Sequence, residues 1–354
     1  MRVTVARGEE AALALLDDPR WNELVRGQPR PNPTLLGGWQ RALMGLKLGV
    51  PIVIAVEHGA ELVAGGPFGL HRALGGRLSY ATWLGRAFQP FSPDVIARTS
   101  EAVDVLVDAL LGEVDIVRLW ALAEGSTVAA VERRAPWGSV RPAPSGTLVV
   151  ELPTPTRPRL LRSLAKDERR ASRAGVRVET WVTTDPEAIA RALERLFRLH
   201  RERWWGDPQE NANFSTSAET RALHRNAVAA VAREGRAQIV EIAEDGRLVA
   251  SHLSLLAGRG GVAYTMAMRR GKGLASPGHR AYVVAIDELQ AAGCEVVDIG
   301  GGTLDPASPK GRLKPTHEPF VEVFVAASPR LQRMANSALA GRATVRRIRH
   351  PRQR

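Results

Sequence analysis

Cysteine is nearly absent from this chain, since one residue, Cys294, occurs among 354. A single cysteine excludes an internal disulfide and the zinc sites built from several cysteines. Long hydrophobic runs are missing as well, because no segment approaches the roughly 18 apolar residues that span a bilayer. The first residues, Met1 to Asp18, become acidic where a secretory signal would stay apolar. These absences predict a soluble, cytoplasmic protein without a membrane span.

Several catalytic motifs are missing too. The sequence contains no His-Glu-x-x-His zinc motif, no Gly-x-Ser-x-Gly elbow and no Gly-Lys-Ser/Thr phosphate loop. With 44% hydrophobic residues, however, the chain is long enough to form two domains. We therefore expect a globular protein that binds no metal and no cofactor tightly.

The net charge of +12 is distributed unevenly. Residues 1–156 contain 15 Lys and Arg against 16 Asp and Glu, a net charge of −1, whereas residues 157–354 contain 34 against 21, a net charge of +13. A field of that sign attracts phosphate-bearing partners such as nucleic acid, a nucleotide co-substrate or anionic lipid. A generally arginine-rich proteome would explain the total charge but not its asymmetry.

Two segments resemble each other. Pro51–Leu70 and Ala237–Leu256 each place a glycine-containing turn between two apolar runs, which predicts a β-hairpin. A helix-like stretch and a short strand follow each hairpin, at Val107–Leu119 and Ala285–Ile299. Corresponding residues lie 181 to 186 positions apart. This spacing indicates two copies of one α/β unit, because a solenoid would need at least three repeats.

A proline-rich linker separates the two copies. Glu151–Arg159 holds three prolines in nine residues and cannot continue a sheet or a helix. We predict an N-terminal domain at residues 1–155, a catalytic domain at 156–327 and a basic C-terminal helix or tail at 328–354, which contains eight arginines and no acidic residue.

The segment after the linker predicts a basic helix that ends at Gly175, where glycine can adopt a left-handed cap. Six cations recur in it at steps of mostly three or four residues and so share a broad face. They are Arg159, Arg162, Lys166, Arg169, Arg170 and Arg173.

The order of motifs after residue 157 resembles a known superfamily. The basic helix "KDERRASRAGV", the helix ending "LHRERWW", the hairpin "EDGRLVASHLSLL", the segment "SPGHRAYVVAIDELQAAGCEVVDIGG" and a lysine before a closing strand, Lys314, follow one another. This order resembles the GNAT acyltransferases, within the tandem group of Fem-type aminoacyl-tRNA-dependent transferases and BioF2-like and CelD-like acetyltransferases. The resemblance implies an α/β fold of two GNAT-like domains, each a mixed, mostly antiparallel sheet flanked by helices, and amide-bond formation as the reaction.

The loop before the helix at Pro277 is the expected donor site. Arg270, Gly273 and Ala275 satisfy the GNAT pattern Arg/Gln-x-x-Gly-x-Gly/Ala, and the free amides of the helix start suit a pyrophosphate or a tRNA 3′ end. An ordinary turn leading into a helix would show the same residues. The predicted donor-binding residues are Arg270, Gly273, Ser276, Gly278 and Arg280.

Two of the four predicted catalytic residues, Asp298 and Lys314, flank a glycine-rich loop at 300–302, and the other two, His252 and Tyr264, lie on predicted strands. The resemblance implies that Lys314, in preference to Lys310, stabilises charge on a carbonyl or a phosphate. Asp298 closes a strand and could take the proton of an amine, or could form a structural hydrogen bond into the loop. His252 could act as a base and Tyr264 as the acid for the leaving group, and the alternative for both is packing.

Three functions remain open at this point. The first is an aminoacyl-tRNA-dependent transferase that acts on a small amine or a peptide, with the basic helix as its tRNA surface. The second is an acyl-CoA-dependent N-acetyltransferase. The third is a GNAT fold that only binds nucleic acid or protein.

Overall fold

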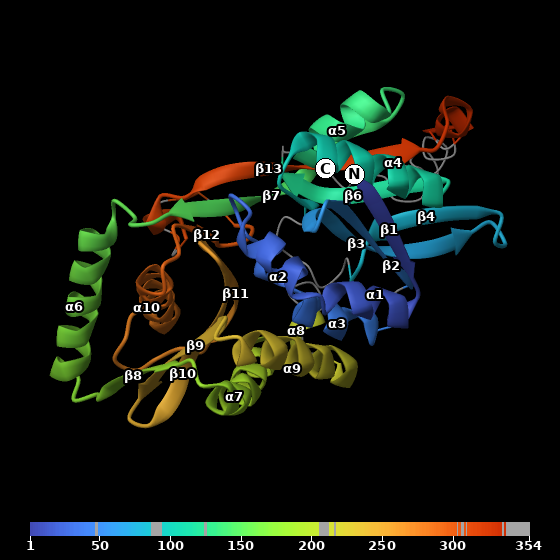
Figure 1. Ribbon diagram of the computed structural model, residues 1–354. Coiled ribbons are helices and arrows are strands. Elements are labelled where there is room, and N and C mark those ends of the chain that lie inside the picture. The colour runs from blue at the N-terminus through green and yellow to red at the C-terminus, as the bar shows by residue number, and fades with distance from the viewer. Residues whose placement is uncertain are drawn as a thin grey trace.

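A single sheet runs through the whole molecule (Figure 1). The computed structural model describes residues 1–46, 49–85, 94–123, 126–204, 212–215, 217–302, 304–305, 308, 310–334 and 336–337. Its strands are β1 (Arg2–Arg7), β2 (Val50–His58), β3 (Glu61–Ala73), β4 (Leu78–Trp83), β5 (Ile96–Ala97), β6 (Ile116–Ala123), β7 (Ser139–Glu151), β8 (Val178–Thr183), β9 (Ala237–Glu244), β10 (Arg247–Ala257), β11 (Gly260–Met268), β12 (Val296–Asp298) and β13 (Thr316–Ala326).

Helices cover both faces of the sheet. They are α1 (Glu9–Leu16), α2 (Pro19–Arg26), α3 (Gly37–Met44), α4 (Ser100–Glu113), α5 (Ser126–Arg134), α6 (Arg157–Arg173), α7 (Pro186–Trp204), α8 (Ala212–Ser215), α9 (Ala218–Arg233) and α10 (Pro277–Ala291), with the 3₁₀ turns η1 (Pro33–Leu35) and η3 (Gly311–Leu313).

The order of the strands is symmetric about the centre of the sheet. It runs β1-β2-β3-β4-β6-β13-β7-β12-β11-β10-β9-β8, and β5 pairs with β3. Each half therefore has four consecutive antiparallel strands followed by a short parallel pair, β4 with β6 and β11 with β12. This arrangement confirms the α/β fold with two related halves.

The two hairpins match in detail. In the first, Glu57 pairs with Leu62 and the register shifts by one residue at Val63. In the second, Ala243 pairs with Leu248 and the register shifts at Val249. Each residue of the second hairpin lies 186 positions after its counterpart, so both copies contain a β-bulge at the same place.

The halves exchange their last strands. β7 follows the first half in the sequence but pairs with β12 of the second, and β13 follows the second half but pairs with β6 of the first. β7 and β13 also pair with each other, which makes the sheet continuous. The predicted domain boundary near residue 155 thus falls after a strand that both halves use, and it stays a prediction.

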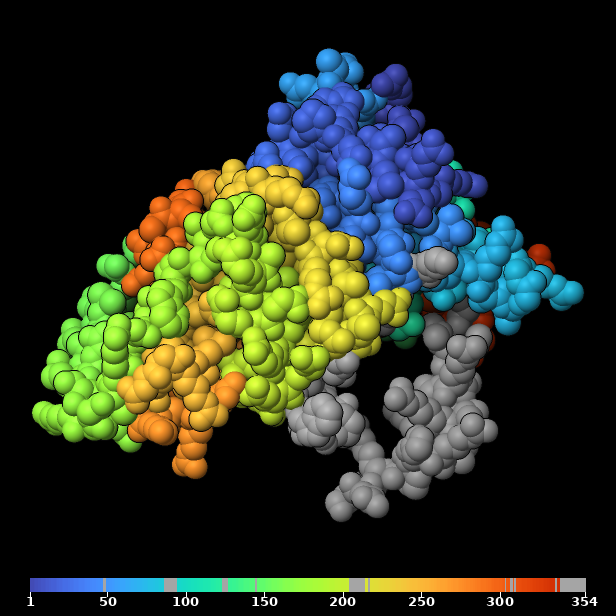
Figure 2. Space-filling view, turned by 90° about the horizontal axis from the view of Figure 1, so that it is seen from below, coloured from blue at the N-terminus to red at the C-terminus, as the bar shows by residue number. Residues whose placement is uncertain are grey.

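A common core joins the halves on one face of the sheet. Buried residues of α1, α2 and α3 form one cluster with those of α7 and α9. A Cβ on Gly38 of α3 would lie 2.8 Å from the Cβ of Ala230 in α9, so glycine allows the two helices to approach closely. Figure 2 shows the yellow surface of α9 directly against the blue surface of the first half. On the opposite face, α4 and α5 cover the first half and α10 and α6 the second.

The helix boundaries agree with the sequence signals. α6 ends at Arg173, and Gly175 follows with a φ of +67°. The Asp185 carboxylate accepts a hydrogen bond of 2.8 Å from the Ala188 amide at the start of α7. No helix among the described residues is long and apolar enough to cross a membrane. Most of the basic tail, residues 338–354, lies outside the described residues.

Candidate active site

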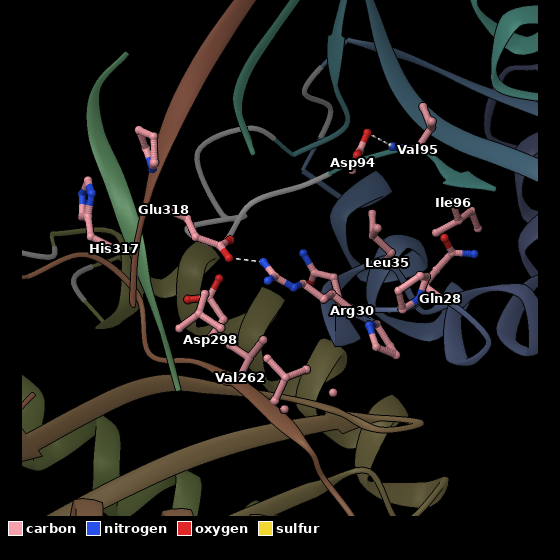
Figure 3. Close-up of a pocket in the computed structure, with 18 residues that line it drawn as sticks. Gln28, Arg30, Leu35, Asp94, Val95, Ile96, Val262, Asp298, His317 and Glu318 are labelled. Carbon is pink, nitrogen blue, oxygen red and sulfur yellow. Dashed lines mark hydrogen bonds and ion pairs between the residues drawn. The ribbon is translucent and has the colours of Figure 1, made fainter. Parts of the chain in front are cut away.

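A pocket of about 570 Å³ lies between the two halves (Figure 3). One wall comes from residues 28–35 and 94–96 of the first half. The other comes from β7, β11, β12 and β13, including Val149, Val262, Asp298 and Glu318. Both halves are therefore needed to form it.

Two glycines let the halves approach each other at this pocket. A Cβ on Gly260 would lie 2.4 Å from the Pro31 carbonyl oxygen, and one on Gly258 would lie 2.3 Å from the Arg26 carbonyl oxygen. Neither position has room for a side chain. The segment that forms one wall of the pocket is thus held directly against the start of β11.

Asp298 lies at the end of β12, where the parallel pair separates. β12 stops at Asp298, opposite Val262, while β11 continues to Met268. The Thr147 hydroxyl and the Gly300 amide both donate to Asp298 Oδ1, the amide over 2.7 Å. Burial raises the pKa of Asp298 to about 6, although these two hydrogen bonds oppose the rise. A carboxyl group with this pKa is suited to accept a proton near neutral pH.

The glycine-rich loop encloses Lys310. Lys310 Nζ donates to the carbonyl oxygens of Ile299, at 2.5 Å, and Gly301, at 2.6 Å. A Cβ on Gly302 would lie 3.1 Å from Lys310 Cδ, so the loop closes over this side chain. Burial lowers the pKa of Lys310, and its charge in turn lowers the pKa of Asp298. Lys310 therefore lies beside the candidate base.

Lys314 occupies a different environment. It ends η3 in a left-handed conformation, with a φ of +50°, and its side chain is exposed. It is not among the residues that line the pocket. The preference for Lys314 over Lys310 thus rests on the resemblance alone.

Three further charged residues of the pocket were missed by the sequence analysis. Arg30 forms an ion pair with Glu318, and Glu318 raises the pKa of Asp298 (Figure 3). Asp94 lies across the pocket, where burial raises its pKa to about 6. No motif surrounds these residues. They meet only because the halves are joined.

His252 and Tyr264 are not brought together. His252 is buried on the α10 side of the sheet, with its ring edge-on to Tyr282 at 5.2 Å and burial lowering its pKa to about 3. Tyr264 lies on the opposite face, where its hydroxyl is 2.9 Å from His224 Nε2 and its ring 5.0 Å from that of Trp39. Neither side chain lines the pocket. Their predicted roles remain untested.

The predicted donor loop is closed by the protein itself. The amides of Lys272, Gly273 and Leu274 all donate to the carboxylate of Glu244. Gly278 and Ser276 lie at the start of α10 as expected. Arg270 is exposed.

Arg280 points away from the loop. Its Nη2 donates to Glu168 of α6 over 2.7 Å, and Nε donates to the Thr180 hydroxyl over 3.2 Å. The side chain is only 10% exposed. Arg280 thus links α10 to α6 and β8, and its predicted contact with phosphate would require this link to open.

Comparison with known proteins identifies the second half. Residues 158–305 match the family model of the acetyltransferase (GNAT) domain. This segment is a GNAT domain. It includes β11, β12 and α10, and it contributes Asp298 to the pocket. The chain is accordingly an acyltransferase. No curated protein matches it.

Solved structures share the fold over most of the chain, among them the following three. FemX has a TM-score of 0.63 and 12% identity, over 88% of this chain and 96% of that one. The C-terminal domain of a protein named as a lysylphosphatidylglycerol synthetase, from Agrobacterium fabrum, has a TM-score of 0.55 and 12% identity, over 94% and 97%. A protein of unknown function from Bacteroides thetaiotaomicron has a TM-score of 0.52 and 10% identity, over 89% of this chain and 97% of that one. At such identities the likeness shows the fold alone.

The basic helix α6 begins the GNAT domain and lies at the edge of the molecule (Figure 1). Its six predicted contact residues are all exposed. Within the described part of the chain, none of the six forms an ion pair, although Arg157 at the start of the helix pairs with Asp287. They are Arg159, Arg162, Lys166, Arg169, Arg170 and Arg173. Their charge is therefore available to a phosphate-bearing partner.

Proposed function

We propose that this chain transfers an aminoacyl group from aminoacyl-tRNA to the amine of a small molecule or peptide. The observation that carries the proposal is the position of Asp298. It ends β12 where β11 and β12 separate, and its carboxyl group lines the pocket between the halves. An acceptor amine in this pocket would lie next to a base.

The proposed reaction forms one bond and breaks one. The amine nitrogen attacks the carbonyl carbon of the aminoacyl ester, and the C–N bond forms as the bond from that carbon to the ribose oxygen breaks. Asp298 takes the proton that the amine loses and can return it to the ribose oxygen. Such proton transfer contributes about 10²- to 10⁴-fold to a rate.

The unpaired cations of α6 support tRNA as the donor. A protein that neutralises phosphates releases their counterions, so its affinity falls steeply as salt rises. Six exposed cations on one helix exceed what a single small anion needs. A tRNA donor would also place the reaction in the cytoplasm, where charged tRNA is found.

The alternative donor is acyl-CoA, which the loop at residues 270–275 suggested. The deciding experiment incubates the protein with charged total tRNA or with acetyl-CoA and a panel of amines, and detects products by mass spectrometry. We expect products with charged tRNA only, formed about 10²- to 10⁴-fold more slowly by the Asp298→Asn variant. Products from acetyl-CoA without tRNA would refute the proposal.

A further inference from the structure

Three consecutive backbone amides converge on one carboxylate at the entrance to α10. The Leu274 amide donates to Glu244 Oε1 over 2.6 Å, and the Gly273 amide donates to the same atom over 3.2 Å. The Lys272 amide donates to Oε2 over 2.5 Å. Successive amides that point inward in this way form a concave anion-binding site. Here the site is filled by the protein's own side chain.

The carboxylate is fitted closely into this site. Glu244 is 4% exposed, and no cation of the described residues forms an ion pair with it. A Cβ on Gly271 would lie 2.5 Å from Glu244 Oε1, so glycine is required for this approach. A buried charge needs hydrogen bonds or a partner of opposite sign, and in this case the amides supply them.

The other side of the loop is also closed. A Cβ on Gly273 would lie 2.9 Å from Val176 Cβ and 3.1 Å from Ala171 Cβ. Leu274 packs in one cluster with Ala171 at the end of α6. A phosphate could therefore reach the three amides only by displacing Glu244.

We infer that Glu244 selects the donor, because it occupies the amides that would hold a pyrophosphate and thereby excludes acyl-CoA. This inference rests on the proposed function, since it concerns which donor that reaction uses. Two anions cannot share the same three N–H groups, and a pyrophosphate brought beside a buried carboxylate would be repelled. A donor that carries no pyrophosphate, such as an aminoacyl ester, avoids this conflict.

Calorimetric titration with inorganic pyrophosphate and with CoA tests the inference. We expect neither to bind the unchanged protein. The Glu244→Ala variant should bind pyrophosphate at least about tenfold more tightly, since the three amides lose their internal acceptor. Glu241→Gln is the matched control. Glu241 lies on the same strand and is 3% exposed, but its carboxylate pairs with Arg195 and not with the loop.

Each outcome has a definite meaning. Sub-millimolar binding of CoA to the unchanged protein would overturn the inference, as would a folded Glu244→Ala variant that gains no affinity for pyrophosphate. If this variant unfolds, refolding in pyrophosphate should restore its circular dichroism spectrum, and failure to restore it would also overturn the inference. Transfer from aminoacyl-tRNA is assayed separately. Its absence, together with pyrophosphate binding by Glu244→Ala, would refute the proposed donor and leave the role of Glu244 standing.

Discussion

Arg30 and Glu318 form an ion pair across the boundary between the two halves (Figure 3). Arg30 precedes η1 in the first half, and Glu318 lies on β13, the strand that the second half gives to the first. Asp298 lies beside Glu318, on the wall of the pocket opposite residues 28–35. The candidate base is thus surrounded by charges from both copies of the repeat, and its role can be tested by changing each of these charges separately.

Replacing Asp298 by asparagine should remove the base. We expect kcat to fall by about 10²- to 10⁴-fold, because asparagine cannot accept the amine's proton. The unchanged enzyme should show kcat/KM rising with pH through about 6, where Asp298 loses its proton. The asparagine variant should lose this rise. Measuring kcat/KM from pH 4.5 to pH 8.5 for the enzyme and the variant checks both expectations. The same rise in the variant would show that a residue other than Asp298 is the base.

Two neighbours of Asp298 should move this pH profile in opposite directions. The Thr147 hydroxyl lowers the pKa of Asp298, so Thr147→Val should shift the rise to higher pH. Glu318 raises the same pKa, so Glu318→Gln should shift the rise to lower pH. Shifts of the same sign in both variants would show that the observed pKa belongs to another group.

The stability of the protein should depend on the same group. The pKa of Asp298 is about 6 in the folded protein and 3.8 as its reference value. Because the folded protein holds this proton more tightly than the unfolded chain, the protonated carboxyl stabilises the fold. This stabilisation is fully present below about pH 4 and is lost as the pH rises through 6, and the loss amounts to at most about 3 kcal/mol in the free energy of unfolding. The Asp298→Asn variant should not show this decrease in stability, because asparagine does not titrate.

Urea unfolding at pH 4.5 and pH 7.5 measures the effect. The free energy of unfolding of Asp298→Asn minus that of the unchanged protein should be larger at pH 7.5 than at pH 4.5. A difference between the two proteins that is the same at both pH values would contradict the raised pKa. Loss of activity together with a gain in stability would be typical of an active-site group.

Local sequence signals predicted much of the fold. The hairpins, the end of α6 before Gly175 and the start of α10 at Pro277 all follow from residues close together in the sequence. The exchange of β7 and β13 could not be predicted in this way, because strands that pair across 145 to 210 residues of sequence leave no periodic signal.

The candidate site was only partly predictable for the same reason. Asp298 was identified because it ends a strand before a glycine-rich loop. Arg30 and Asp94 have no motif around them and acquire a role only when the halves meet. The loop at 270–275 matched its pattern, yet the pattern could not reveal that Glu244 occupies its amides.

The proposed tRNA surface can be tested by neutralising part of α6. The triple change Arg169→Gln, Arg170→Gln and Arg173→Gln keeps good helix formers at three exposed positions. We expect weaker tRNA binding and a salt dependence whose slope falls by up to about 0.9 for each phosphate that the variant no longer neutralises. Arg72→Gln near the end of β3 together with Arg77→Gln on the turn before β4, both exposed, controls for the loss of surface charge and removes two charges against three. Equal effects of both sets would mean that α6 is not a defined tRNA surface.

The two lysines near the glycine loop can be separated by substitution. Lys310→Ala should lower stability, because Lys310 Nζ donates to two loop carbonyls and removing each hydrogen bond costs about 1 kcal/mol or more. It should also raise the pKa of Asp298, which the Lys310 charge lowers, and so shift the rise of the pH profile to higher pH.

Lys314→Ala should change stability little, because its side chain is exposed. If the role implied by the family resemblance is correct, however, Lys314→Ala should reduce kcat with no shift in the profile. Unchanged kcat in Lys314→Ala, beside a shifted profile in Lys310→Ala, would assign the functional lysine to position 310.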